Sequence, residues 1–220
     1  MSDLEILPPA DAILEQVAPA LLQVLNREEI LIGGGTALAA RWRHRRSADI
    51  DLTVPAACLA GKQELMARLL TECSVMDVQF GPGRLAGDCE SGDFCIMTTA
   101  PLLPSLPVPD GRENRFGLGL EATAEILARK LRHRIYSNGT FVSRDFYDIC
   151  TAGEEDREAL DLALSVMSDE ERWEISREIA GMGAGAVRLG RPLTEVHRPS
   201  WLKDLGERTA ELIAPSRPGT

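Results

Sequence analysis

One stretch in the first quarter of the chain constrains the fold more than any other, because three consecutive glycines are followed by two aspartates at positions 49 and 51. Residues 29–32 before the glycines are typical of a short buried strand, and residues 37–42 after them are mostly good helix formers. Side chains alternate along a strand, so we expect Asp49 and Asp51 to point to the same face. The stretch therefore predicts a strand, a tight turn, a helix and a second strand that carries two parallel carboxylates.

The same residues have the chemistry of a site for phosphate and a divalent cation. Free N–H groups at the start of a helix bind anions, and the expected phosphate ligands near that start are Gly34, Gly35, Thr36 and Ser47. Parallel carboxylates suit hard cations, so Asp49 and Asp51 are the candidate ligands of Mg²⁺ or Mn²⁺. The alternative interpretation is a plain strand-to-helix turn followed by two solvent-facing acids.

The segment GGTALAARWRHRRSADIDLTV, residues 34–54, resembles the AbiEii/AbiGii toxin family of nucleotidyltransferases, which has the DNA polymerase beta-like fold. That family combines Gly-Gly-Thr-Ala-Leu with His-Arg-x-Ser-x-Asp-hydrophobic-Asp. A second block is similar too: EILARKL at 125–131 resembles the family's lysine helix, and RDFYDI at 144–149 its Arg-Asp-x-x-Asp helix. The two blocks occur in order, which makes the match more specific than either motif alone.

The resemblance implies an α/β fold, with a nucleotidyltransferase-like mixed β-sheet flanked by helices and followed by a C-terminal helical region. It implies an Mg-dependent enzyme that moves an NMP from an NTP to an acceptor hydroxyl, with RNA such as the tRNA 3′ end as acceptor and a cognate antitoxin as partner. In the second block it implies catalytic or nucleotide-binding roles for Lys130, Asp145 and Asp148. It also implies a third carboxylate on a later strand, for which Asp93 is the first candidate and Asp77 the second.

Three arginines just before the aspartate pair are candidates for RNA binding: Arg43, Arg45 and Arg46. The net charge of −10 argues against nonspecific nucleic-acid binding over the whole surface, but it allows a local basic face. The alternative for these arginines is a solvated helix face. The acidic balance also leaves open nucleotidyl transfer to a protein or a small molecule, and the unclear third carboxylate leaves open a catalytically silent nucleotide-binding relative.

Residues 100–119 are rich in proline and glycine and indicate a boundary within the chain. We expect an α/β core over residues 1–110 and a mainly helical region over residues 111–220 that packs on the core and completes the active site. No apolar run is long enough to span a bilayer, and the acidic N-terminus lacks the features of a signal peptide. The sequence thus predicts a cytoplasmic protein with no membrane partner.

Overall fold

The computed structural model describes residues 4–106, 114–182 and 193–215, and the chain divides into two compact units. Unit 1 runs to Pro101 and takes in residues 106–122. Unit 2 contains residues 102–105 and continues from Thr123. The predicted boundary between residues 110 and 111 lies outside the described residues. Among those described, the chain changes from unit 1 to unit 2 after Ala122.

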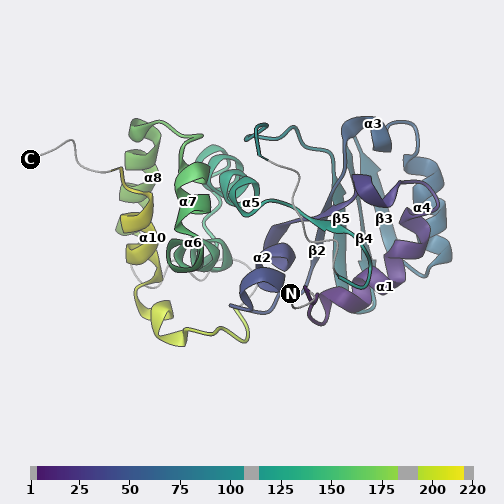
Figure 1. The fold of residues 1–220 in the computed structure, drawn as a ribbon, viewed down its shortest axis with the longest axis horizontal. Coiled ribbons are helices and arrows are strands. Elements are labelled where there is room, and N and C mark those ends of the chain that lie inside the picture. The colour runs from purple at the N-terminus through teal and green to yellow at the C-terminus, as the bar shows by residue number, and fades with distance from the viewer. Residues whose placement is uncertain (1–3, 107–113, 183–192, 216–220) are drawn as a thin grey trace, which may run out of the picture. The chain divides into compact units, whose positions relative to one another are not determined.

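Unit 1 is built on a mixed six-stranded sheet with the order β3-β4-β5-β2-β1-β6 (Figure 1). The pairs β2–β5 and β1–β6 are parallel and the other neighbours are antiparallel. The strands are β1 (Leu31–Ile32), β2 (Ile50–Thr53), β3 (Met76–Gly81), β4 (Arg84–Cys89), β5 (Gly92–Met97) and β6 (Gly119–Leu120). The first and last strands of the unit in chain order therefore lie side by side.

Helices cover one face of this sheet. The helical segments of unit 1 are α1 (Ala10–Leu21), η1 (Arg27–Glu29), α2 (Gly34–Trp42), α3 (Ala56–Leu59) and α4 (Gln63–Glu72). Helices α1 and α4 pack on each other, and α1 also contacts β2 and β5 (Figure 1). Along β2, Ile50 and Leu52 are fully buried, whereas Asp51 is partly exposed. Because side chains alternate on a strand, Asp51 points to the face opposite Ile50 and Leu52.

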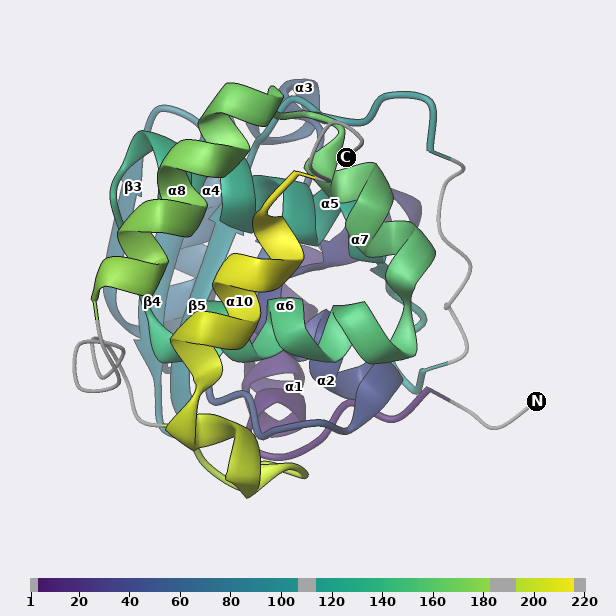
Figure 2. The same ribbon diagram turned by 90° about the vertical axis from the view of Figure 1, so that its left-hand side faces the viewer.

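Unit 2 is helical in its described residues. Its elements are α5 (Thr123–Arg129), the π-helical η2 (Lys130–Ser137), α6 (Ser143–Glu155), α7 (Arg157–Leu164), α8 (Asp169–Gly181), η3 (Pro199–Lys203) and α10 (Leu205–Ile213). Helix α10 packs on both α6 and α8, and α5 packs on α7 (Figure 2). Phe146, Tyr147 and Ile149 of α6 are fully buried, so this helix forms much of the core of the unit.

The predicted α/β fold with a C-terminal helical region is confirmed. No local sequence pattern indicates β4 or the two-residue β6. In the C-terminal helical region, α5 is continued by a π-helical segment, a form that is rare and frequently found at functional sites. No helix within the described parts of the chain is long and apolar enough to cross a membrane.

Candidate functional site

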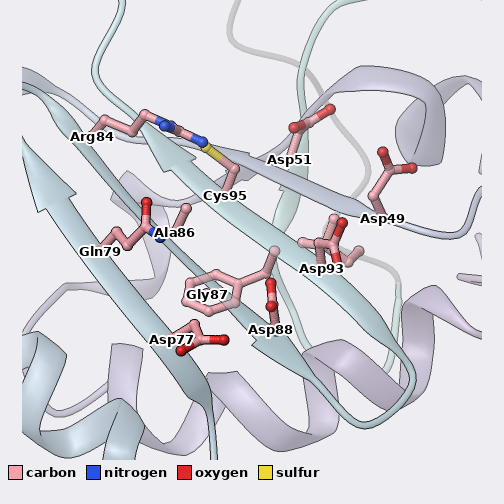
Figure 3. Close-up of a pocket in the computed structure, with 12 residues that line it drawn as sticks. Asp49, Asp51, Asp77, Gln79, Arg84, Ala86, Gly87, Asp88, Asp93 and Cys95 are labelled. Carbon is pink, nitrogen blue, oxygen red and sulfur yellow. The ribbon is translucent and has the colours of Figure 1, made fainter. Parts of the chain in front are cut away.

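The aspartate pair of unit 1 lines an open hollow on the sheet. Asp51 is in β2 and pairs with Cys95 of the parallel strand β5. Asp49 immediately precedes β2, and both aspartates line a hollow of about 330 Å³ (Figure 3). The acidic residues around it are Asp49, Asp51, Asp77, Asp88 and Asp93. One arginine, Arg84, also lines it, so the hollow is strongly negative.

The glycine turn holds its backbone directly against Asp51. The N–H of Gly33 donates to the carbonyl oxygen of Asp51 at 2.8 Å. Gly34 begins α2 with a φ of +57°, and a Cβ added there would lie within 3.0 Å of the carboxylate oxygen Oδ2 of Asp51. Glycine is therefore needed at position 34 both for its backbone conformation and for the close approach of the carboxylate.

The buried side chains of Thr36 and Ser47 lie beside the same glycine turn. The Thr36 hydroxyl donates to the carbonyl oxygen of Asp49 at 2.6 Å, and Thr36 is buried. The hydroxyl predicted to hold phosphate is therefore engaged in holding Asp49 in place. Ser47 is also buried, with Oγ at 3.1 Å from the position of a Cβ on Gly35, so its side chain faces the start of α2.

The three candidate RNA-binding arginines do not share one surface. Arg43 and Arg46 are exposed, and Arg43 pairs with Glu5 at 2.9 Å. Arg45 is 5% exposed, and its guanidinium lies over Gly35, in space that any side chain at that position would fill. A buried arginine cannot form part of an exposed RNA-binding patch, so the structure places Arg45 with the glycine turn instead.

Both candidates for the third carboxylate line the hollow, and the register of β2 and β5 places Asp93 beside Asp49. Asp93 of β5 lines the hollow, while Asp77 lies on β3 at the edge of the sheet (Figure 3). The position on β5 opposite Asp51 is occupied by Cys95. Burial raises the pKa of the Cys95 thiol, and Arg84 Nε donates to its sulfur at 3.4 Å. A thiol with a raised pKa stays protonated at neutral pH, so Cys95 cannot replace a carboxylate.

Within the described residues, no group of three or more His, Cys, Asp or Glu side chains is arranged to hold a metal ion. The donor pair Asp49 and Asp51 nevertheless fits Mg²⁺, because this ion usually takes one or two protein carboxylates and completes its shell with water and substrate phosphates.

The second block forms a separate, buried ionic cluster inside unit 2. Lys130, the first residue of η2, places Nζ at 2.5 Å from Oδ1 of Asp145 and at 3.0 Å from Oδ2 of Asp148. Arg134 Nε lies at 3.1 Å from Oδ2 of Asp145. Lys130 is 5% exposed and both aspartates are 0% exposed. The structure thus brings together all three residues predicted from this block.

The architecture of the chain matches that of two solved structures from Helicobacter pylori. One, described as "putative nucleotidyltransferase from H. pylori", superposes with a TM-score of 0.56 at 14% identity over 92% of each chain. JHP933 from Helicobacter pylori gives a TM-score of 0.55 at 14% identity, over 92% of this chain and 89% of the other. The fold is nucleotidyltransferase-like. No protein-family model and no curated protein sequence matches the chain.

In this nucleotidyltransferase-like fold, one residue that sequence reasoning overlooks stands next to the glycine turn. Glu121 follows β6 and donates its backbone N–H to the carbonyl oxygen of Ile32 at 2.8 Å. Its side chain is 4% exposed, with Oε2 at 2.6 Å from the position of a Cβ on Gly33. The two-residue strand before it gives no alternating pattern, so only the pairing of β6 with β1 reveals this position.

Proposed function

We propose that the chain is a metal-dependent nucleotidyltransferase that moves an NMP from an NTP to an acceptor hydroxyl. The observation that carries this proposal is the joint placement of two carboxylates and a helix start in unit 1. The Thr36 hydroxyl holds the backbone of Asp49, and Gly34 lies against the carboxylate of Asp51. The nucleotidyltransferase-like fold supports the same reaction class.

The residues of unit 1 suggest how an NTP would be held. Backbone N–H groups at the start of α2 face outward from a helix and favour phosphate. Arg45, buried over Gly35, would add a fixed positive charge whose planar donors match phosphate oxygens. Asp49 and Asp51 would hold Mg²⁺ or Mn²⁺. When bound, such an ion neutralises phosphate charge and orients the groups for in-line displacement.

For the acceptor, we propose RNA resembling the tRNA 3′ end, as the resemblance to the AbiEii/AbiGii toxin family implies. The same resemblance suggests a role as the toxin of a toxin–antitoxin pair with a cognate antitoxin. Arg43 and Arg46, which precede the aspartate pair in the sequence, are the exposed members of the arginine group, and they are our candidates for contact with RNA phosphates.

A second candidate acceptor is a cationic small molecule or a basic protein segment. The observation that favours it is the acidic hollow of unit 1, where five carboxylates and one arginine line the surface around Asp49 and Asp51. Such a surface attracts positive charge and repels an RNA backbone. A third possibility follows from Cys95 opposite Asp51: a silent relative that binds NTP without turning it over.

The experiment is label transfer from each α-labelled NTP, with Mg²⁺, to total RNA, to protein and to polyamine-like small molecules. Wild type is compared with Asp51→Asn and with Glu90→Gln, which removes an exposed charge from the turn between β4 and β5. We expect label in one acceptor pool with wild type and Glu90→Gln, and none with Asp51→Asn. Label in RNA supports the first acceptor, and label in protein or small molecules the second. Transfer that survives Asp51→Asn contradicts the proposed site.

A further inference from the structure

Glu121 stands in one row with Asp51 across the sheet. Leu31 pairs with Thr53 and Ile32 with Leu52 in antiparallel register, so Gly33 is the next position and faces Asp51. Leu31 pairs with Gly119 and Ile32 with Leu120 in parallel register, so Gly33 also faces Glu121. Paired residues in neighbouring strands point to the same face of a sheet. Glu121 therefore points to the face that carries Asp51, with Gly33 between them.

The missing side chains of the glycine turn make room for these two carboxylates. A Cβ on Gly33 would meet Oε2 of Glu121 at 2.6 Å, and a Cβ on Gly34 would meet Oδ2 of Asp51 within 3.0 Å. Neighbouring strands are about 4.8 Å apart, so a side chain on the intervening strand would normally separate the two acids. Because that position is a glycine, the two carboxylates lie against consecutive residues of the turn, Glu121 against Gly33 and Asp51 against Gly34.

The other side of Asp51 offers no equivalent group. There the paired residue is Cys95, which is partly buried and whose sulfur accepts a hydrogen bond from Arg84. Glu121 is thus the carboxylate in the row through Asp51. We infer that Glu121 supplies the third carboxylate of the catalytic face and accepts the proton of the attacking hydroxyl. This inference rests on the proposed nucleotidyl transfer.

In that step, the acceptor hydroxyl gives its proton to Oε of Glu121 while its oxygen forms a bond to the α-phosphorus of the NTP. The bond from the α-phosphorus to the bridging oxygen of pyrophosphate breaks, and pyrophosphate leaves with the electron pair. A carboxylate that takes this proton in the transition state contributes to turnover and not to NTP affinity. The expected signature is a lowered kcat with an unchanged NTP Kd.

The test measures turnover and NTP binding for the full chain carrying Glu121→Gln, Glu121→Ala or Asp93→Asn, with Glu90→Gln as the control. We expect Glu121→Gln to lower kcat by roughly 100-fold or more while the NTP Kd and the melting temperature stay unchanged. We expect added formate, which fits the space left in Glu121→Ala, to restore part of the turnover. Glu90→Gln should retain it, and any loss in Asp93→Asn should be much smaller than the loss in Glu121→Gln.

Three results overturn the inference. Turnover by Glu121→Gln within threefold of wild type removes the residue from the reaction. Loss of NTP binding or of thermal stability, or failure of formate to restore Glu121→Ala, assigns it a structural role. If Asp93→Asn loses turnover while Glu121→Gln keeps it, then Asp93 of β5, and not Glu121, supplies the third carboxylate. If wild type itself releases no pyrophosphate, the proposed function fails as well, so the two failures can be told apart.

Discussion

The two units each gather acidic side chains, but they do so in opposite environments. In unit 1, Asp49 and Asp51 are partly exposed on the rim of an open hollow. In unit 2, Asp145 and Asp148 are fully buried and contact Lys130, while Arg134 reaches Asp145. Two cations balance two anions in the second case. The acidic site of unit 1 suits reversible binding of a cation, whereas the charges of the unit 2 cluster already neutralise one another.

This difference changes the interpretation of the lysine block. The resemblance implies that Lys130 contacts phosphate, yet its ammonium lies within 3.0 Å of oxygens from two buried aspartates. A charge already neutralised in this way attracts phosphate less strongly. The cluster joins η2 to α6, so its first effect is on the stability of unit 2. Variants in both units separate this role from that of unit 1.

Lys130→Met has the largest expected effect on stability. It removes the ammonium that contacts the buried carboxylates of Asp145 and Asp148, while Arg134 stays in contact with Asp145. Breaking a buried ion pair on one side costs about 3–5 kcal/mol, and we expect the free energy of unfolding in urea to fall by this amount. Lys203→Met, which removes an exposed lysine of unit 2, is the matched control. Equal stability of the two variants would mean that the cluster does not hold unit 2 together.

Arg45→Ala is expected to weaken NTP binding in unit 1. A hydrogen bond to a charged group contributes about 1.5–3 kcal/mol, which corresponds to an increase in the NTP Kd of about 10- to 150-fold. Arg43→Ala and Arg46→Ala remove exposed arginines and should leave NTP binding unchanged while lowering transfer to RNA. Calorimetric titration with a non-hydrolysable NTP checks the first effect. An unchanged NTP Kd for Arg45→Ala would show that Arg45 does not contact the phosphates.

Gly34→Ala tests the contact between the turn and Asp51. A residue other than glycine at a φ of +57° costs about 1–2 kcal/mol, and the new Cβ would also displace the Asp51 carboxylate. Gly61→Ala is a matched control, because its φ is +71° and nothing lies within 4 Å of the new Cβ. We expect similar losses of melting temperature in both variants and loss of turnover in Gly34→Ala alone. Equal turnover would show that the contact with Asp51 is dispensable.

The smallest effect concerns a partly exposed ion pair of unit 2. Ser168 accepts a hydrogen bond from the N–H of Glu171 at the start of α8, and the Glu171 carboxylate contacts Arg132. The side-chain hydrogen bond from Arg132 is the main cause that lowers the pKa of Glu171. A lowered pKa stabilises the fold above the unfolded-state pKa, and this contribution disappears as the pH falls through the folded value.

We expect Ser168→Ala to lower the free energy of unfolding by about 1 kcal/mol through loss of the helix cap. Glu171→Gln should remove a contribution that is present at pH 7 and is lost progressively as the pH falls below the unfolded-state pKa, so the stabilities of wild type and variant should approach each other in acid. Thermal melts over a series of pH values check this. A difference in stability that does not change with pH would assign the effect to packing and not to charge.

The sequence predicts these regions unequally, for physical reasons. The glycine turn and the aspartate pair are adjacent in the chain, so local backbone rules suffice to predict strand, helix and parallel carboxylates. β4 contains Ala86 and Gly87, which have low strand propensity, and its conformation depends on pairing with both β3 and β5. Glu121 joins the row of Asp51 only through the pairing of β6 with β1, which no local pattern indicates.

The burial of Arg45 is a similar case. In the sequence it is one of a run of basic residues and is indistinguishable from Arg43 and Arg46. Its position over Gly35 depends on the path of the chain between α2 and β2. Composition and charge runs report which side chains are available, whereas the role of each one depends on tertiary contacts.

Pyrophosphate release is the measurement that tests the central claim most directly. Wild type, Asp49→Asn and Asp51→Asn are incubated with each NTP and Mg²⁺ or Mn²⁺, with and without a chelator, and with the acceptor pool identified by label transfer. We expect metal-dependent release by wild type and a loss of about 100- to 1000-fold in either variant, with melting temperatures unchanged. Two results would contradict the account. One is pyrophosphate release that persists in both variants, and the other is no release by wild-type protein that binds NTP.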